Sequence, residues 1–395
     1  MTYRARFIPI LITLLSLTAC GGGNSSFQST PTEPTRSFHM GFTPFPPNFS
    51  DNPDTLTQIV DEVYNKLATN ADLVAHHFDN GIPWNDALTD NYPYKDNIIN
   101  DWQLRLDKTP VNHKKYISVT PIDFNRSGLA LLRDTADDMP LQTPFNTHAS
   151  TGDFSHNDIK TAYLNYCLRI IAFFNPDYFA IGIESNLLRK NTDAATWQKY
   201  LELNQYVYSE LKSAHPNLPV FVSVAPLEAI EGYVGPSNEF TGDSAGYAAS
   251  QASAINDIIN NSDYYAIAVY PFMSNFFNST LPSDFLDRIF ALQTKPIAIA
   301  ETGMLAESTT LFSTTFISDE QTQADYVSNM LSKSDEHDLV FINWFIQQDY
   351  DGLCNYYGGC TDLQGLWRDT GLYDGFGNAR ASLTTWQTYL AYKTR

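Results

Sequence analysis

The stretch DYFAIGIESN, residues 177–186, has the pattern of a buried strand that runs directly into an acid. Ala180, Gly182 and Glu184 occupy alternate positions, so their side chains share one face, and isoleucines occupy the other face. A strand that is apolar on both faces is typical of a parallel sheet covered by helices. The small residues predict a face that lines a crowded barrel interior, and Glu184 then emerges at the mouth of that barrel.

Seven further apolar runs of strand length occur along the chain, and helical patterns separate them. The predicted strands are residues 38–45, 72–78, 116–122, 177–184, 219–226, 264–271, 295–302 and 339–346. The predicted helices are residues 54–68, 157–174, 194–213, 246–260, 284–291, 321–333 and 379–392. This alternation predicts an α/β fold, a single (β/α)8 TIM barrel over residues 37–395. The alternative, an open doubly wound sheet, lacks a glycine-rich phosphate loop after its first strand.

In such barrels the chemistry lies at the carboxyl ends of the strands. Glu184 ends the fourth predicted strand and Glu301 ends the seventh, where alternation predicts that Ile297, Ile299 and Glu301 point inward. Two carboxyl groups that face each other across a barrel suit glycoside hydrolysis, in which one donates a proton and the other attacks the anomeric carbon. A retaining mechanism needs these groups about 5–5.5 Å apart.

Four short motifs carry a family resemblance. They are Glu184 after the fourth strand, the Tyr270-Pro271 pair, PIAIAETG around Glu301, and INWF around Trp344. Together they resemble the clan of retaining (β/α)8 glycoside hydrolases known as the 4/7 superfamily, and VYP and ETG are most similar to the family 53 endo-β-1,4-galactanases. The resemblance implies that Glu184 is the general acid/base and Glu301 the nucleophile. It also implies that Tyr270 hydrogen-bonds the nucleophile and that Trp344 is the floor on which the sugar stacks.

The chain departs from that clan at one position, because Ile183 stands where an asparagine usually contacts the sugar 2-hydroxyl. We expect Asn186 or a histidine of the second strand to make this contact. The candidate substrate-binding residues are polar or aromatic residues near the strand ends, namely His76, His77, Asp79, Trp84, Asn186, Tyr270 and Trp344.

Alternatives remain open for the candidates after the second strand. Alternation lets only one of His76 and His77 face the site, and a structural role or a metal ligand is the other interpretation of a histidine here. Trp84 either stacks on a sugar or anchors its loop. We predict no metal and no cofactor, because these histidines have no matching cluster at ligand spacing.

The N-terminal residues have the pattern of an export signal. Arg4 and Arg6 precede an apolar run, and LTAC then places Cys20 before three glycines. LTAC resembles the lipobox of bacterial lipoproteins, which implies a signal peptide over residues 1–19, a lipidated Cys20 and a location in the bacterial cell envelope. An ordinary secretory peptide is the alternative. Residues 20–36 have the Gly, Ser, Thr and Pro composition of a flexible tether.

The remaining cysteines and the net charge of the chain limit the bonds and the partners that we expect. Cys354 and Cys360 lie in a glycine-rich loop of a predicted exported protein, which predicts a local disulfide, with a metal pair as the alternative. Cys167 falls in a helical pattern and is expected to be a buried apolar residue. The formal net charge of −20 argues against nucleic acid as a partner. We expect the protein to be a monomer that is attached to the membrane only through its N-terminal lipid.

The predicted function is a retaining hydrolase of a β-linked polysaccharide or oligosaccharide that cleaves within the chain. Two alternatives use the same residues. A non-catalytic glycan-binding lipoprotein on a degenerate barrel is suggested by Ile183, and a transglycosylase is separated from a hydrolase only by its products.

Overall fold

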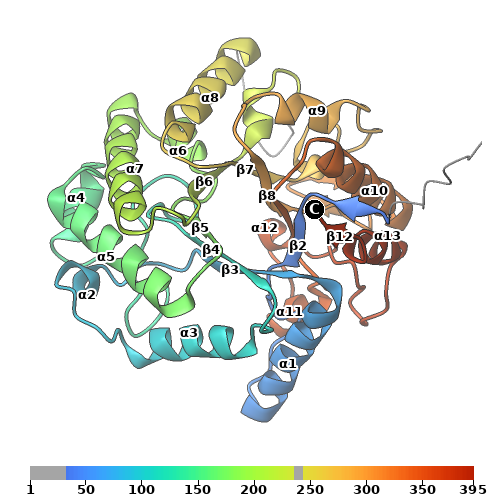
Figure 1. The fold of residues 1–395 in the computed structure, drawn as a ribbon, viewed down its shortest axis with the longest axis horizontal. Helices are drawn as coiled ribbons and strands as arrows, with labels where there is room; N and C mark the ends of the chain where they lie inside the picture. Colours follow the sequence, from blue (N-terminus) through green and yellow to red (C-terminus); the bar gives the residue numbers. More distant parts are fainter. Residues whose placement is uncertain (1–32, 235–242) are drawn as a thin grey trace, which may run out of the picture. The chain divides into compact units, whose positions relative to one another are not determined.

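Eight parallel strands close into a barrel, in the order β11-β2-β3-β4-β5-β6-β7-β8 (Figure 1). The computed structural model describes residues 33–234 and 243–395, and Thr35–Arg395 forms one unit. The strands are β2 His39–Phe42, β3 Leu73–Phe78, β4 Lys114–Val119, β5 Tyr178–Ala180, β6 Val220–Val224, β7 Tyr265–Val269, β8 Ile297–Thr302 and β11 Phe341–Trp344. Each overlaps one predicted strand, so the predicted (β/α)8 barrel is confirmed.

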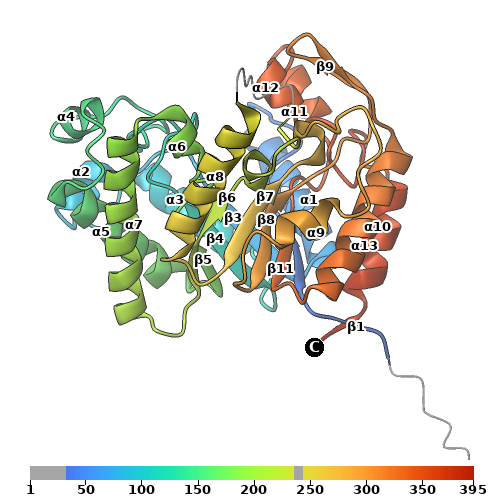
Figure 2. The same cartoon turned by 90° about the horizontal axis from the view of Figure 1, so that it is seen from above.

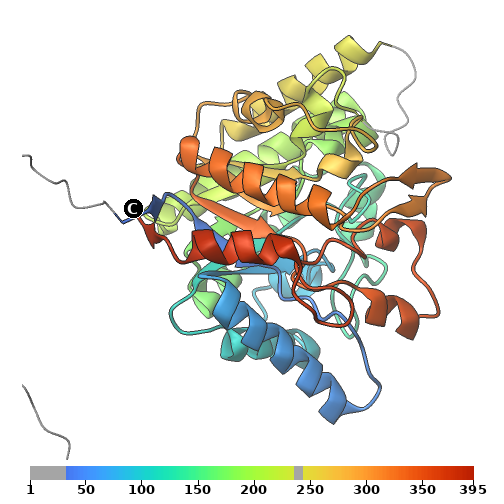
Figure 3. The ribbon, with the colours of Figure 1, turned by 90° about the vertical axis from the view of Figure 1, so that its right-hand side faces the viewer.

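Helices surround the barrel. The 13-residue helix α3 Asp96–Lys108 was not predicted, but seven others overlap the seven predicted helices. These are α1 Pro53–Asn70, α5 Asn157–Phe174, α7 Ala194–Ala214, α8 Ser244–Ile259, α9 Phe285–Phe290, α10 Glu320–Glu336 and α13 Ala381–Leu390. α10 and α13 pack side by side on the outside (Figure 3). The remaining helices are α2 Trp84–Leu88, α3 Asp96–Lys108, α4 Phe145–Ser150, α6 Leu187–Asn191, α11 Asp351–Tyr356 and α12 Asp362–Gly365, with the short η1 Pro226–Ala229 and η2 Pro271–Met273.

The core has two parts that correspond to the two faces of the strands. One cluster is built from strand residues alone and fills the barrel interior: Leu73, Ala75, Tyr116, Ala180, Phe221, Ala266, Ala298, Ala300 and Phe341. The other cluster joins the outward strand residues to the helices. Small residues such as Ala180 leave room for the large rings inside, where Tyr116 and Phe341 lie 4.9 Å apart between ring centroids.

An irregularity in β8 changes which of its residues point inward. Ile267 of β7 pairs with Ile299, but Ala268 pairs with Glu301, so β8 carries one extra residue between these pairs. The prediction that Ile297 and Ile299 point inward with Glu301 is therefore wrong. Both isoleucines pack in the helix-facing cluster, and the bulge returns Glu301 to the inner face.

The two ends of the barrel differ. In Figure 2, α11, α12 and the hairpin of β9 Thr309–Leu311 and β10 Thr314–Phe316 lie at one end, and the chain's last residues lie at the other. There β1 Thr35–Arg36 pairs with β12 Lys393–Thr394, and Arg36 binds Asp72 at 2.7 Å. Two residues predicted to belong to the tether are thus part of the barrel unit.

The predicted signal peptide, most of the tether and Cys20 lie outside the described residues. Within residues 33–234 and 243–395, no helix has both the length and the apolar character needed to cross a membrane.

Candidate active site

A cavity of about 780 Å³ opens at the carboxyl end of the barrel. Its floor and walls bring together residues that lie in or after β2, β3, β4, β5, β7, β8 and β11, although these are far apart in the sequence. The lining residues that carry charge or an aromatic ring include Phe45, His77, Asp79, Phe124, Arg126, Glu184, Tyr270, Glu301, Phe345, Tyr350, Tyr357 and Trp367. Both predicted catalytic acids therefore line the same cavity.

Glu184 lies four residues past the end of β5, in a bent segment of the chain. Its φ is +48°, an uncommon conformation for a residue with a side chain. Its amide donates to Ser223 Oγ at 3.0 Å, which ties the bend to β6. Gly182 is needed here, because an added Cβ would lie 2.4 Å from Ser185 Oγ and 2.8 Å from Tyr200 Oη. This backbone aims the Glu184 side chain into the cavity instead of along the sheet.

The surroundings of Glu184 favour its protonated form. Burial raises the pKa of Glu184 to about 7, and the negative charges of Glu301 and Asp79 add to that effect. Arg126 opposes them, since its Nη2 lies 3.4 Å from Glu184 Oε2. The side chain remains 24% exposed, so it is accessible from the cavity. A carboxyl group with this pKa can donate a proton near neutral pH.

Glu301 lines the same cavity and is held there by hydrogen-bonding and charged neighbours. Tyr270 donates its hydroxyl to Glu301 Oε2 at 3.1 Å, as the family resemblance implies. Nδ1 of His77 lies 3.5 Å from Glu301 Oε1. Burial alone would lower the pKa of His77, but Glu301 and Asp79 outweigh it and raise that pKa. The raised pKa favours the cationic form of His77 beside the Glu301 carboxyl group.

A buried charge network supports both acids. Asp79 binds Arg126 Nη2 at 2.9 Å and lies 3.9 Å from His77 Nε2. Burial would raise the pKa of Asp79, but Arg126 and His77 hold it below its usual value. Arg126 was not predicted as a site residue, because it lies in the loop after β4 and not at a strand end. It also stands at φ +54°.

Aromatic rings and a disulfide loop form the outer part of the cavity. Phe345 packs edge-on against Phe45 and Trp367, at 5.7 and 6.3 Å between ring centroids. The structure joins Cys354 to Cys360 by the predicted disulfide, and both cysteines line the cavity wall. Cys167 is buried and free, as predicted.

The two strand-end histidines point to opposite faces, as alternation requires. His77 lines the cavity, whereas His76 is fully buried and bonds Thr109 Oγ1 at 2.8 Å. Burial lowers the pKa of His76 to about 3, so it stays neutral. The substrate-binding prediction for His76 is wrong because it faces the helices.

Asn186 was also predicted to contact substrate, and its position does not allow it. Its amide group bonds Ala225 O and Gln251 Oε1, both at 3.1 Å, and the residue is fully buried. Neither it nor Ile183, which is also buried, lines the cavity. Of the two expected substitutes for the clan's asparagine, only His77 lies in the cavity.

The two predicted sugar-stacking tryptophans are core residues. Trp84 donates to Ala130 O at 2.8 Å and stacks on Phe145, so it anchors its loop. Trp344 is fully buried, donates to Thr370 O at 2.9 Å and faces α10 and α13. Alternation explains the error, because Trp344 shares the outward face of β11 with Ile342, and Phe345 is the neighbour that lines the cavity.

Histidine and carboxylate side chains could hold a metal ion at two places in the described parts of the chain. One group is His148, His156 and Asp158, and the other is Asp349, Asp351 and Asp369. Neither group contributes to the cavity lining.

The comparisons with known proteins rest on structure alone. No family model matches the chain, and no curated protein matches it in sequence. A GH5_18 protein from Bifidobacterium longum subsp. longum aligns with a TM-score of 0.61 at 12% identity, over 91% of this chain and 81% of the other. A GH5_18 protein from Streptomyces cattleya in complex with GlcNAc aligns with a TM-score of 0.57 at 12% identity, over 91% and 83%. A fungal β-1,4-galactanase aligns with a TM-score of 0.50 at 15% identity, over 84% and 91%. The chain therefore has the (β/α)8 fold that these glycoside hydrolases share.

Proposed function

We propose that the chain is a retaining glycoside hydrolase that acts on a β-linked polysaccharide or oligosaccharide. One observation carries the proposal: a glutamic acid with a pKa of about 7 and a second, hydrogen-bonded glutamate line the same cavity at the carboxyl end of the barrel. Environments that differ in this way divide the roles of acid and nucleophile between two carboxyl groups.

In the first step Glu184 donates its proton to the glycosidic oxygen, and the leaving sugar departs as an alcohol. The Glu301 carboxylate attacks the anomeric carbon from the other side and forms a glycosyl ester. Tyr270, which bonds Glu301 Oε2, orients the attacking group.

In the second step Glu184, now ionised, removes a proton from a water molecule. The resulting hydroxide equivalent attacks the anomeric carbon and releases Glu301, so the product keeps its β-configuration. The raised pKa of His77 favours its cationic form, which lies 3.5 Å from Glu301 and stabilises the departing carboxylate.

The cavity walls favour a carbohydrate partner. Phe345, Trp367 and Phe45 present apolar faces of the type that sugar rings stack on, and they replace Trp344 in that role. The lining extends from the barrel strands to the disulfide loop, so we expect more than one sugar ring to bind and cleavage within a chain. GH5_18 proteins have been solved in complex with GlcNAc and with Manb1-4GlcNAc, which makes these sugars the first to test.

The test is hydrolysis of a panel of β-linked oligosaccharides and polysaccharides, including Manβ1-4GlcNAc and β-1,4-galactan. We expect wild type to cleave at least one member and Glu301→Gln to lose that activity by about 10³-fold or more. Full activity of Glu301→Gln on every cleaved substrate would refute the assignment.

Glycan binding without catalysis is the second candidate function. The observation that favours it is the absence of an amide side chain at Ile183, which leaves the sugar 2-hydroxyl without its usual contact. Saturable binding of an oligosaccharide with no cleavage by wild type would establish this function instead.

We also propose that Cys20 carries a lipid that holds the protein at the bacterial cell envelope. The support is the LTAC motif after an apolar run. Mass spectrometry of protein purified from membranes should find an acylated Cys20, and Cys20→Ala should release the protein into the soluble fraction.

A further inference from the structure

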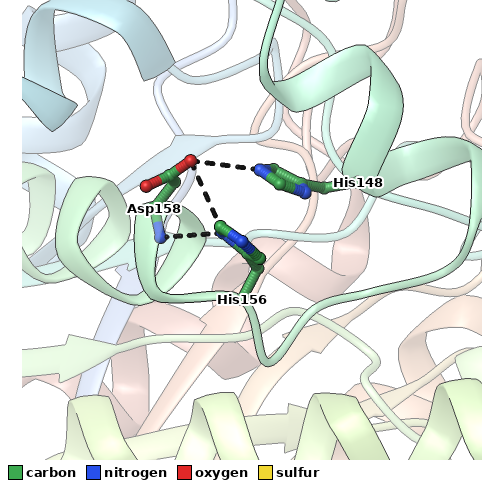
Figure 4. Close-up of side chains that lie close together, drawn as sticks. All are labelled: His148, His156 and Asp158. Atoms are coloured by element: carbon green, nitrogen blue, oxygen red, sulfur yellow. Dashed lines mark hydrogen bonds and ion pairs between the residues drawn. The ribbon is translucent and has the colours of Figure 1, made fainter.

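Three side chains from the segment that runs from α4 into α5 lie close together, outside the catalytic cavity. His148 lies near the end of α4, His156 is the residue that caps α5, and Asp158 lies in the first turn of α5. Figure 4 shows the two imidazole rings and the carboxylate facing one another. His148 Nε2 lies 3.2 Å from Asp158 Oδ2, and His156 Nδ1 lies 3.5 Å from the same oxygen.

We propose that these three residues bind a zinc ion, which links α4 to the start of α5. Zinc bonds of about 2.0–2.1 Å in a tetrahedron place neighbouring ligand atoms about 3.3 Å apart. The distances from Asp158 Oδ2 to His148 and to His156, 3.2 and 3.5 Å, fall on either side of that value. Two of the three separations between ligand atoms therefore already match zinc coordination, and all three atoms lie within 4.8 Å of one another.

The donor set selects zinc over the harder cations. Two imidazole nitrogens and one carboxylate oxygen are usual zinc ligands, whereas calcium and magnesium take oxygen ligands. The −20 net charge of the chain also favours the approach of a cation.

The site is open on one side, which leaves room for a fourth ligand. The side chains of His156 and Asp158 are 40% and 34% exposed, whereas His148 is 12% exposed. A water molecule can therefore complete the tetrahedron. None of the three residues lines the catalytic cavity, so the zinc has a structural role and takes no part in the proposed hydrolysis.

Zinc must displace the interactions that hold these groups in its absence. The proton that lies between His148 Nε2 and Asp158 must leave that nitrogen before the nitrogen can bind zinc. His156 Nδ1 also accepts the amide N–H of Asp158 at 3.2 Å, and zinc competes with this helix-capping bond. The rings of the two histidines stack, with centroids 3.7 Å apart and planes 22° apart, so one ring must turn before both nitrogen lone pairs can point at one ion.

The experiment is a calorimetric titration of the EDTA-treated full chain with ZnCl2. We expect one zinc per wild-type chain and at least tenfold weaker binding by His148→Gln and by Asp158→Asn. Circular dichroism checks that both variants fold. His337→Gln is the matched control, because His337 pairs with Asp287 at 2.8 Å but has no second histidine. His77→Gln tests whether zinc binds in the catalytic cavity instead.

Zinc should also raise the thermal midpoint of wild type, His337→Gln and His77→Gln, but not of the two site variants. Absence of saturable binding by wild type would overturn the proposal, and so would equal affinity in wild type and His148→Gln. Loss of binding in His77→Gln alone would move the site to the catalytic cavity and also overturn it.

Discussion

Replacing Glu184 with glutamine should stabilise the protein relative to wild type, increasingly as the pH rises from about 4.5 to about 7. Burial raises the pKa of Glu184 to about 7 from an ordinary value of 4.5, so the folded protein holds a proton that the unfolded chain has lost. Between these two values the folded state binds more protons, and the free energy of unfolding falls as the pH rises. Glutamine cannot ionise and escapes this loss.

The size of the effect follows from the two pKa values. A pKa difference of about 2.5, at 1.36 kcal/mol for each unit, corresponds to about 3 kcal/mol. The contribution is fully present below pH 4.5 and is lost once the pH exceeds about 7. The stability of Glu184→Gln relative to wild type should therefore rise by about 3 kcal/mol between pH 4.5 and pH 8.

Urea denaturation of both proteins at these two pH values measures the difference without any substrate. Glu62→Gln, an exposed glutamate on α1, is the matched control and should change stability by less than about 0.5 kcal/mol at both pH values. A stability difference between wild type and Glu184→Gln that does not vary with pH would refute the assignment of Glu184 as the protonated acid.

Three further perturbations test other parts of the site. Arg126→Leu leaves Asp79 buried without its main partner and should lower the free energy of unfolding by about 3–5 kcal/mol in urea titrations, with partial recovery when Asp79→Asn is added. Tyr270→Phe removes one hydrogen bond to a carboxylate and should lower kcat/KM by about 10–100-fold on the substrate that the panel identifies, with unchanged stereochemistry. Replacing Cys354 and Cys360 with serine should cost about 2 kcal/mol in urea titrations and weaken oligosaccharide binding, because the loop forms a cavity wall. Unchanged values in any of these measurements would contradict the contact concerned.

Much of the fold could be predicted from the alternation of apolar strands with helices. The positions of Glu184 and Glu301 at strand ends followed from that alternation, because parallel strands bring their carboxyl ends to one side of a barrel. The inward direction of Ala180 was also predictable from its spacing to Glu184, and the structure places it in the interior cluster.

Local departures from regular geometry could not be predicted. Because β8 contains an extra residue, Ile297 and Ile299 point outward, opposite to the prediction from Glu301. No residue type in the sequence indicates a bulge there. The family resemblance predicted Trp344 as the sugar-stacking residue. Its side chain instead lies on the outward face of β11 and packs against α10 and α13. Arg126 reaches the site from a long loop through contacts with Asp79, which only the folded chain reveals.

The most direct test of the central claim is to trap the glycosyl ester. Wild type is treated with an activated 2-deoxy-2-fluoro-β-glycoside of the sugar that the panel identifies, and its peptides are analysed by mass spectrometry. The double-displacement mechanism predicts one sugar per chain, attached to Glu301, and none on Glu301→Gln. A sugar on another residue, or hydrolysis that releases a product of inverted configuration without any ester, would contradict it.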